Sequence, residues 1–486
     1  MAEAGPGRSD LGSLKPNSYL EASHENEASQ LCIDHRIGAV VRWKHLGATE
    51  VIDQALGNPS VAELANWVSD ARRRTLDLVA DLSDAQLMGA KLDIVNPLLW
   101  EIGHIAWFHE KWVLRHVLGR PSIRSDSDAL WDSMAIAHDT RWDLPLPTRQ
   151  ETIDYMGRVN DAILETLVTQ EPTPDLLYHA RYAAHHEDMH GEAFTYTRQT
   201  HGYAAPSLTG MTSDGFAQGG PCIGDVQLAV DEFLLGAKDD GRFAFDNEKW
   251  AHEVRLEPFD IAKAPVAQGE FAAFVDDGGY SRQDLWTADG WEWRESAAVE
   301  HPVYWRSQAP GFWERRVFDR WVELEQHKPV IHVNWHEALA YCRWANRRLP
   351  TEAEWEAAAT LMPNGATEKR RFPWGEVSPD PSRANLDSVV LSCVDVGACS
   401  AGDSEMGCRQ MVGNVWEWTS SDFEPYPGFS PDPYEAYSEP WFHTRKVLRG
   451  GCWASRGRML SSTYRNFYEP HRCDVLAGFR TCALQD

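Results

Sequence analysis

The sequence predicts an α+β protein in which a four-helix bundle precedes a second domain of short strands, turns and a few helices. Between residues 59 and 200, apolar residues recur at helical spacing in four segments. After Gly202 the pattern changes to short strand-like runs separated by turns, and Trp-rich motifs become frequent. Four amphipathic helices of this length form a bundle, and such bundles commonly build metal sites from facing helices.

The changes in pattern set the expected domain boundaries. We expect residues 1–57, rich in Gly, Ser, Glu and Asn, to be a poorly ordered arm. Residues 58–205 would form the helical bundle, residues 206–221 a linker rich in Gly, Ser and Thr, and residues 222–486 the second domain.

Individual helices are marked by apolar stripes and by start signals. The expected helices lie after Pro59, from Asn96-Pro97, and over about 150–169, 174–200, 266–276 and 334–345. Pro97 suits a helix start because its missing N–H falls in the first turn. A further short helix follows Thr351, which would form a capping box with Glu354.

The composition restricts the class of partner. The net charge is −27, from 73 acidic and 46 basic residues, which disfavours nucleic acid and anionic membranes as partners. No run of about 18 apolar residues is present, so we expect no membrane-spanning helix. Nine cysteines without a CxxC pair indicate free thiols in a reducing compartment. We therefore expect a cytoplasmic protein that acts on small molecules.

A histidine pair is the strongest chemical signal in the chain. His186 and His190 are four residues apart in the fourth expected helix, so both imidazoles project from one face. Two neutral imidazoles on one face are suitable ligands for a divalent transition metal. A third ligand is needed, and His104, in the apolar segment after Pro97, is the best candidate.

The same residues also spell the zinc-protease motif His186-Glu187-x-x-His190, in which Glu187 would be the general base. The extended form of this motif needs a Gly and a further His downstream, where this chain has Ala193 and Tyr196. The other large class needs a Glu on a following helix, and no acidic helix follows here. These departures disfavour a protease.

Ordered motifs in the second domain carry a resemblance to a known fold. They include Pro265-Val266, Val333-Asn334-Trp335, Arg348-Leu349-Pro350-Thr351-Glu352, Pro373-Trp374-Gly375, Gly413-Asn414-Val415-Trp416-Glu417-Trp418, Arg449-Gly450-Gly451 and Gly478-Phe479-Arg480. Residues from about 223 to 481 resemble the formylglycine-generating-enzyme/sulfatase-modifying domain, which has a C-type-lectin-like fold. The helical half resembles DinB-like bundles. Such a fusion looks like the sulfoxide synthase family, whose branches make ergothioneine, ovothiol and selenoneine.

The resemblance implies an iron enzyme. His104, His186 and His190 would be the three ligands of a non-heme Fe(II) cofactor, with positions left open for substrate and O₂. The reaction would join sulfur or selenium to the imidazole carbon of hercynine, a trimethylhistidine. The partners would be small molecules, namely hercynine, O₂ and a selenosugar or thiol donor.

The resemblance also assigns roles to residues of the second domain. Tyr434 would be the catalytic tyrosine that faces the iron, and Tyr437 would contact substrate. Asn466 and Phe467 would contact the trimethylhistidine. Arg472 would contact the second substrate.

Departures from an ergothioneine-forming branch indicate a different donor. Tyr468 stands where that branch has an Asp that grips the amino-acid end of its thiol substrate, and Met189 stands where it has Gln. An aromatic ring suits the face of a sugar. The segments around His104, Arg141 and His190 look most like the selenoneine branch. This likeness implies a selenosugar donor and places Arg141 among the substrate contacts.

Other functions stay open on the sequence. The nearest alternative is an ergothioneine-type synthase that uses γ-glutamylcysteine or cysteine. A zinc-dependent DinB-type hydrolase or thiol transferase is another, and a lectin-like binding module with a structural metal is a third. Formylglycine generation is disfavoured, because that reaction uses a close pair of cysteines and Cys452 has no near partner before Cys473.

Overall fold

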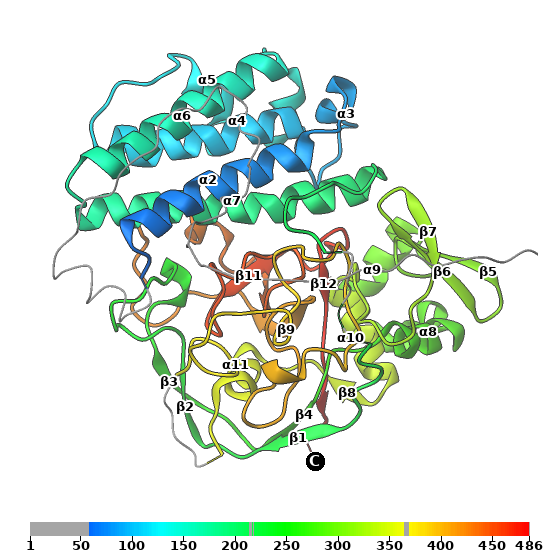
Figure 1. Ribbon diagram of the computed structural model, residues 1–486. Helices are drawn as coiled ribbons and strands as arrows, with labels where there is room; N and C mark the ends of the chain where they lie inside the picture. The colour runs from blue at the N-terminus through cyan, green and yellow to red at the C-terminus, as the bar shows by residue number, and fades with distance from the viewer. Residues whose placement is uncertain (1–57, 213–215, 217, 364–368, 486) are drawn as a thin grey trace, which may run out of the picture. The chain divides into compact units, whose positions relative to one another are not determined.

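The computed structural model describes residues 58–212, 216, 218–363 and 369–485. All of these belong to one compact unit, residues 49–486, and the expected arm at 1–57 lies outside the described residues. A helical bundle is followed in the chain by a strand-rich domain (Figure 1), which confirms the expected α+β class. None of the described helices is both long and apolar enough to cross a membrane.

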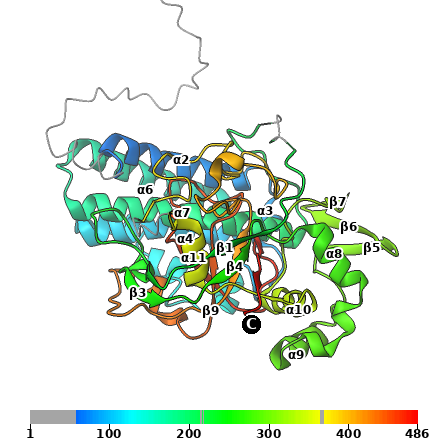
Figure 2. The same ribbon diagram turned by 90° about the horizontal axis from the view of Figure 1, so that it is seen from below.

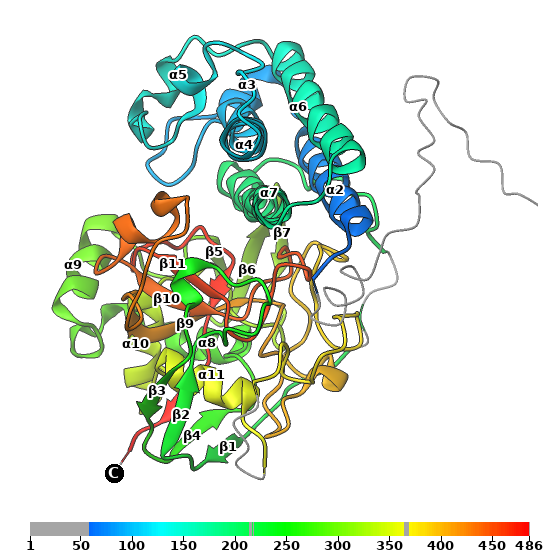
Figure 3. The same cartoon turned by 90° about the vertical axis from the view of Figure 1, so that its left-hand side faces the viewer.

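Four long helices make the bundle. They are α2 (Val61–Val79), α4 (Leu98–His109), α6 (Arg149–Thr169) and α7 (Pro174–His201). Helix α7 packs along α2 and against α4, and α6 packs against both α2 and α4 (Figure 3). Apolar residues from all four helices are buried in their shared core.

Local sequence signals fix where these helices begin and end. Ser60 and Thr148 form capping boxes at the starts of α2 and α6. Helix α7 begins after the N-cap Thr173, with Pro174 in its first turn, and it ends at Gly202, whose φ of 67° is left-handed. Because these signals are local, the sequence alone indicates where the bundle helices begin and end.

The second bundle helix differs in detail from the expectation. Pro97 is the N-cap of α4 rather than a first-turn residue. A π-helix, η1 (Glu110–Val117), continues α4 directly. Two short helices, α3 (Asp84–Met88) and α5 (Ser127–Trp131), were not expected, because five residues are too few to display a helical period.

Two four-stranded sheets form the framework of the second domain. The first has the order β1 (Asp225–Leu228), β4 (Phe259–Ala262), β13 (Cys482–Ala483) and β8 (Arg347–Arg348). The second has the order β11 (Arg465–Tyr468), β10 (Lys446–Arg449), β9 (Trp416–Asp422) and β12 (Ala477–Gly478). In the first sheet, β4 from the early part of the domain therefore pairs with β13 from its end.

Smaller elements surround these sheets. Strands β2 (Glu232–Leu235) and β3 (His252–Arg255) form an antiparallel ribbon. Strands β5 (Trp305–Ala309), β6 (Phe312–Val317) and β7 (Arg320–Glu323) form a separate sheet near α8 (Gln268–Asp276), as Figure 2 shows.

The helices of the second domain lie mostly where the sequence placed them. Helix α8, α10 (Trp335–Trp344) and α11 (Glu352–Thr360) match expected helices, and Thr351 forms the expected capping box with Glu354. Helix α9 (Ala288–Ala297) was not expected. Its one buried residue is Gly290, so it has no apolar stripe that the sequence could reveal.

Helix α7 contacts the second domain through buried polar groups. Glu192 accepts hydrogen bonds from Trp416 Nε1 at 2.8 Å and from Cys452 Sγ at 3.6 Å. Asp188 accepts two hydrogen bonds from Arg458, both at 2.7 Å. Helix α7 is therefore an element that the bundle and the second domain share.

A third carboxylate of α7 ties the helix to its own bundle. Glu187 accepts hydrogen bonds from Arg72 Nε at 2.9 Å and from Thr75 Oγ1 at 2.8 Å, and it lies 3.0 Å from His109 Nε2. Burial raises the pKa of Glu187, but Arg72 and His109 outweigh that effect and lower the pKa to about 2. The carboxylate is therefore a buried anion with fixed partners.

Replacing Glu187 by Ala should destabilise the fold by about 3–5 kcal/mol, because it leaves the buried Arg72 charge without a partner. Urea unfolding followed by far-UV circular dichroism measures the loss. Glu165→Ala removes an exposed carboxylate from α6 as the control, and it should change stability by under about 0.5 kcal/mol. A loss under about 1 kcal/mol for Glu187→Ala would contradict a stabilising role for this ion pair.

Candidate metal centre and active-site cavity

Three histidines from two packed helices converge in the bundle. His104 lies on α4, and His186 and His190 lie on α7. The candidate ligand atoms of the three side chains all lie within 4.8 Å of one another. The ring centroids are 5.3 Å apart for His104 and His186 and 4.6 Å apart for His186 and His190. The structure thus brings together the three residues that the sequence singled out.

Hydrogen-bond partners fix the orientation of two of the rings. His104 Nδ1 lies 2.8 Å from the Trp131 carbonyl oxygen, and His190 Nδ1 lies 2.6 Å from Glu101 Oε1. A bond at Nδ1 leaves Nε2 free for a metal, and metal-ligating histidines usually have such a partner. Glu101 was not among the expected site residues. Its place three residues before His104 on the same helix was the available signal.

Aromatic rings enclose the other sides of the cluster. His186 stacks on Phe108 with centroids 3.6 Å apart, and His104 stacks on Trp100 at 4.8 Å. Burial lowers the pKa of His104 and of His186, and the neighbouring His190 lowers both further. At neutral pH these two imidazoles are therefore uncharged, as metal ligands must be.

The donor set fits a divalent transition metal such as Fe(II). Three imidazoles can occupy one side of a coordination sphere and leave other positions free. The zinc-protease alternative fits less well, because its general base would be Glu187. That carboxylate is held by Arg72 and Thr75 on the bundle side of α7 and is not directed at the cluster.

An open cavity of about 250 Å³ lies beside the histidines, with walls from α7 and from the second domain. The lining residues are His186, Met189, His190, Ala193, Tyr196, Tyr434, Ala436, Tyr437, Trp441 and Tyr468. Six of the expected site residues therefore share one cavity. Tyr196 and Trp441 were not expected, and neither belongs to a motif that marks it in the sequence.

Tyr434 brings a phenol from the second domain to the histidine cluster. Its ring lies edge-on to His186, with centroids 6.3 Å apart, and edge-on to Phe108 at 5.0 Å. Burial raises the pKa of Tyr434, and a hydrogen bond with Ser133 offsets part of that effect. The hydroxyl is therefore protonated at neutral pH.

A second cavity of about 330 Å³ meets the first at Tyr434. Trp107 and Trp112 give it aromatic walls, and Lys111, Asp132, Glu435 and Glu439 add charged groups. None of these six was an expected site residue. Trp107 and Lys111 follow His104 along the same run of helix, which was the only sequence signal for them.

Arg141 lies outside both cavities. Its guanidinium covers the Trp100 ring at 4.0 Å and donates a hydrogen bond to Asn96 Oδ1 at 2.7 Å. Burial lowers its pKa to about 10, while the nearby Glu101 and Tyr434 oppose that shift. Arg141 therefore sits behind the residues of the site rather than on the cavity wall.

The two expected trimethylhistidine contacts lie on strand β11. Phe467 stacks on Phe423 with centroids 4.0 Å apart, and it is 6.0 Å from the Tyr437 ring. The side-chain oxygen of Asn466 accepts a hydrogen bond from the backbone N–H of Phe467 at 2.8 Å. Neither residue lines the cavity beside the histidines, and Phe467 packs behind Tyr437.

Arg472 forms an ion pair with Asp474 within the protein. Its Nε and Nη2 atoms each donate to the Asp474 carboxylate at 2.7 Å. The guanidinium also lies 5.3 Å from the centre of the Tyr468 ring. Arg472 therefore supports a wall of the first cavity, and its charge is already balanced.

Comparison with known proteins matches both domains of this chain. The DinB superfamily matches residues 68–194, and the sulfatase-modifying factor enzyme 1-like domain matches residues 220–484. A formylglycine-generating enzyme from Streptomyces coelicolor is 33% identical over 317 residues, covering 58% of this chain and 95% of that protein.

Two relatives extend over both domains. A hercynine oxygenase from Mycobacterium tuberculosis is 36% identical over 425 residues, covering 87% of this chain and 98% of that protein. A hercynine oxygenase from Mycolicibacterium thermoresistibile is 35% identical over 430 residues, covering 87% of this chain and 95% of that protein. Because the likeness spans the bundle, the second domain and the cavity between them, this chain belongs to the hercynine oxygenase family and is an oxygen-dependent oxidoreductase.

Proposed function

We propose that this chain is a non-heme Fe(II) synthase that uses O₂ to form a C–Se bond on the imidazole of hercynine, with a selenosugar as donor. The three-histidine cluster beside the Tyr434 cavity is the observation that carries the proposal. It combines a ligand set that suits Fe(II) with a hydroxyl group from the second domain. The names of the two full-length relatives support hercynine as the acceptor.

The protein's own contribution would be binding and positioning. His104, His186 and His190 would hold the ion, and Glu101 would keep the His190 ring in place. When bound, Fe(II) would supply open positions at which O₂ and substrate can meet. Overall, a C–H and an Se–H bond would be lost and a C–Se bond formed, with one oxygen atom of O₂ transferred to selenium as the selenoxide and the other released as water with the two protons.

Tyr434 would control a proton at its Oη atom. Burial raises the pKa of Tyr434 and so keeps the phenol protonated at neutral pH. The ring lies on the wall of the cavity that His186 and His190 also line. A proton donor placed there can act on a substrate in that cavity without a further conformational change.

The aromatic character of the cavities supports a sugar donor. Tyr468, Tyr196 and Trp441 line the first cavity, and Trp107 and Trp112 line the second. Such rings suit the apolar face of a sugar. Arg472, the residue expected to contact the second substrate, is already paired with Asp474. Its positive charge is therefore balanced and is less available to the carboxylate of an amino-acid donor.

An ergothioneine-type synthase that uses γ-glutamylcysteine is the second candidate. Lys111 favours it, because this residue lines the second cavity and forms no ion pair with any residue that the structure describes. A lysine there could receive a carboxylate of the peptide donor. Direct competition between donors decides between the two candidates.

Single substitutions of the proposed ligands should remove the metal. His104→Ala, His186→Ala and His190→Ala should each lose iron and turnover while far-UV circular dichroism stays unchanged, because two imidazoles hold Fe(II) weakly. Iron per chain is measured by mass spectrometry after anaerobic loading and gel filtration. His201→Ala, at the end of the same helix, is the control and should keep its iron.

Full iron occupancy in any one of the three variants would exclude that residue as a ligand. The same preparation tests the zinc alternative. Protein loaded with Zn²⁺ should be inactive, whereas activity with Zn²⁺ alone would favour a hydrolase or thiol transferase.

Tyr434→Phe should lower the rate of coupling by at least about tenfold, or about 1.4 kcal/mol in barrier, because only the proton-bearing hydroxyl is lost. Substrate affinity should change little, and product can divert to oxidation of the donor alone. Single-turnover product analysis measures both effects. Tyr203→Phe, outside both cavities, is the control. An unchanged rate and product for Tyr434→Phe would remove this residue from the mechanism.

Donor choice gives the sharpest test of the selenosugar proposal. With hercynine and O₂, a seleno- or thiosugar should exceed γ-glutamylcysteine by at least about a hundredfold in kcat/KM, roughly 2.7 kcal/mol, within reach of one or two mispaired buried polar groups. Tyr468→Asp should narrow the gap by weakening sugar use, and Tyr468→Phe, which keeps the ring, should preserve it. Equal or better use of γ-glutamylcysteine by the parent protein would favour ergothioneine synthesis instead.

A further inference from the structure

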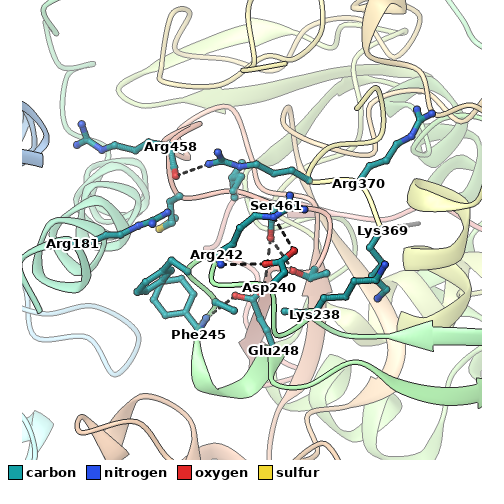
Figure 4. A pocket seen from close by; sticks show the side chains of 17 residues that line it. Arg181, Lys238, Asp240, Arg242, Phe245, Glu248, Lys369, Arg370, Arg458 and Ser461 are labelled. Atoms are coloured by element: carbon teal, nitrogen blue, oxygen red, sulfur yellow. Dashed lines mark hydrogen bonds and ion pairs between the residues drawn. The ribbon is translucent and has the colours of Figure 1, made fainter. Parts of the chain in front are cut away.

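A third cavity, of about 70 Å³, lies between α7 and the segments 237–248, 369–371 and 458–463 of the second domain (Figure 4). It shares no lining residue with either cavity at Tyr434. Nothing in the proposed reaction uses it. Its composition nevertheless stands out from the rest of the chain.

The cavity is strongly basic in an acidic protein. Its lining contains two carboxylates, Asp240 and Glu248, and seven cations, namely Arg181, Lys238, Arg242, Lys369, Arg370, Arg371 and Arg458. The whole chain has 73 acidic and only 46 basic residues. A cluster of positive charge in an otherwise acidic protein attracts anions to this cavity.

Four of the seven cations already have carboxylate partners. Arg242 pairs with Asp240, Lys369 with Glu356, Arg370 with Glu405, and Arg458 with Asp188. In Figure 4, the side chains of Arg370 and Arg458 turn away from the centre of the cavity. The remaining lining carboxylate, Glu248, accepts hydrogen bonds from the Thr463 hydroxyl at 2.6 Å and from the Phe245 N–H at 3.0 Å.

Three cations remain without a carboxylate partner among the described residues: Arg181, Lys238 and Arg371. The Arg371 guanidinium donates to the backbone oxygen of Arg458 at 3.2 Å, and the carboxylate of Glu376 accepts from the Arg371 backbone N–H at 3.0 Å rather than from its guanidinium. Lys238 is half-buried and has no hydrogen bond or ion pair within the described part of the chain. These three side chains are available to a ligand.

Arg181 is the central residue of the group. It is only 9% exposed. Its Nη1 donates to Asn58 Oδ1 at 2.8 Å and its Nε to His185 Nε2 at 3.2 Å, and both of these acceptors are neutral. Its Nη2 has no hydrogen-bond partner among residues 58–212, 216, 218–363 and 369–485. Burial, with a smaller effect of Arg371, lowers its pKa to about 9.

A buried guanidinium without a counter-ion is unfavourable, and proteins normally pair such groups. The rings of Phe243 and Trp67 lie 4.7 and 5.6 Å from the Arg181 guanidinium and offset part of the cost. They do not occupy the Nη2 donor, which is open to solvent in the cavity and faces the space that an anion would fill. An anion in the cavity would satisfy this donor and would also neutralise Lys238 and Arg371.

We propose that this cavity is a binding site for a small oxyanion of the phosphate or sulfate class, held by Arg181, Arg371 and Lys238. Planar guanidinium groups match the geometry of such oxyanions, and a lysine adds a point charge. The volume of the cavity admits a single tetrahedral group. Arg181 lies on α7 five residues before His186, so the anion would stabilise the helix that carries two of the three clustered histidines.

Isothermal titration calorimetry of the full chain with inorganic phosphate tests the proposal, with NaCl added to keep ionic strength constant. Saturable binding with one site per chain is expected, together with a phosphate-dependent rise in Tm. Sulfate and glycerol phosphate are the other two arms. Tighter binding of glycerol phosphate than of phosphate identifies the phosphate group of a metabolite as the ligand, and the reverse order identifies the free ion.

Lys238→Gln and Arg371→Gln should each weaken phosphate binding by about tenfold, because each removes one charge from the site. Lys238 is partly exposed and unpaired, so its substitution should leave the fold intact. Lys263→Gln is the matched control, since Lys263 is also half-buried, lies outside the cavity and forms no ion pair with a described residue.

Two results would overturn the proposal. One is the absence of saturable binding of all three anions to the parent protein at constant ionic strength. The other is an equal loss of phosphate affinity in Lys263→Gln and Lys238→Gln, which would indicate non-specific attraction. Neither result bears on the iron-dependent reaction, because the cavity and the histidine cluster share no residue.

Discussion

The buried charges of helix α7 are the interactions on which the rest of the site depends. Glu187 is held by Arg72 in the bundle, whereas Asp188 and Glu192 are held by Arg458 and Trp416 in the second domain. A helix turns by about 100° per residue. Glu187 therefore faces a different direction from Asp188 and Glu192, which lie one turn apart on the same side of α7. Any rotation or sliding of α7 would separate a buried charge from its partner, which is strongly unfavourable.

Fixing α7 also fixes the chemistry. His186 and His190 share the remaining face of the helix, and His104 is set against them by the packing of α4 on α7. The packing of the second domain against α7 brings Tyr434 to the edge of His186. The histidines therefore come from one domain and the phenol from the other, and the cavity exists only where the two domains meet. The proposed activity therefore depends on the packing of the second domain against α7.

The charged side chains around the cavities divide into balanced and unbalanced groups. Arg472 is neutralised by Asp474, so it supports the Tyr468 wall without offering its charge to substrate. Arg181 has only neutral partners among the described residues and stands in a basic cavity on another part of α7. The same side-chain type thus serves two purposes, and only its partners distinguish them. Counting arginines in the sequence could not separate these cases.

The sequence by itself determined the fold class, the four bundle helices and the three clustered histidines. Helical periodicity and capping signals are local, and the i, i+4 spacing places His186 and His190 on one face without further information. A helix such as α9 stayed hidden because Gly290 is its one fully buried residue, and the half-buried Trp291 and Trp293 are too few to display a helical period. In the second domain, ordered motifs rather than periodicity revealed the fold.

Only the tertiary structure decided what surrounds the histidines. Trp441 and Tyr196 reach the site from different elements, and the contact of Glu101 with His190 joins α4 to α7; no local pattern encodes such contacts between distant segments. The same is true of Asn466 and Phe467: packing places Phe467 against Phe423 and behind Tyr437, and neither residue lines the two cavities at Tyr434. Local spacing sets which face of an element a residue occupies. What that face meets depends on how distant segments pack, and this is a property of the folded chain alone.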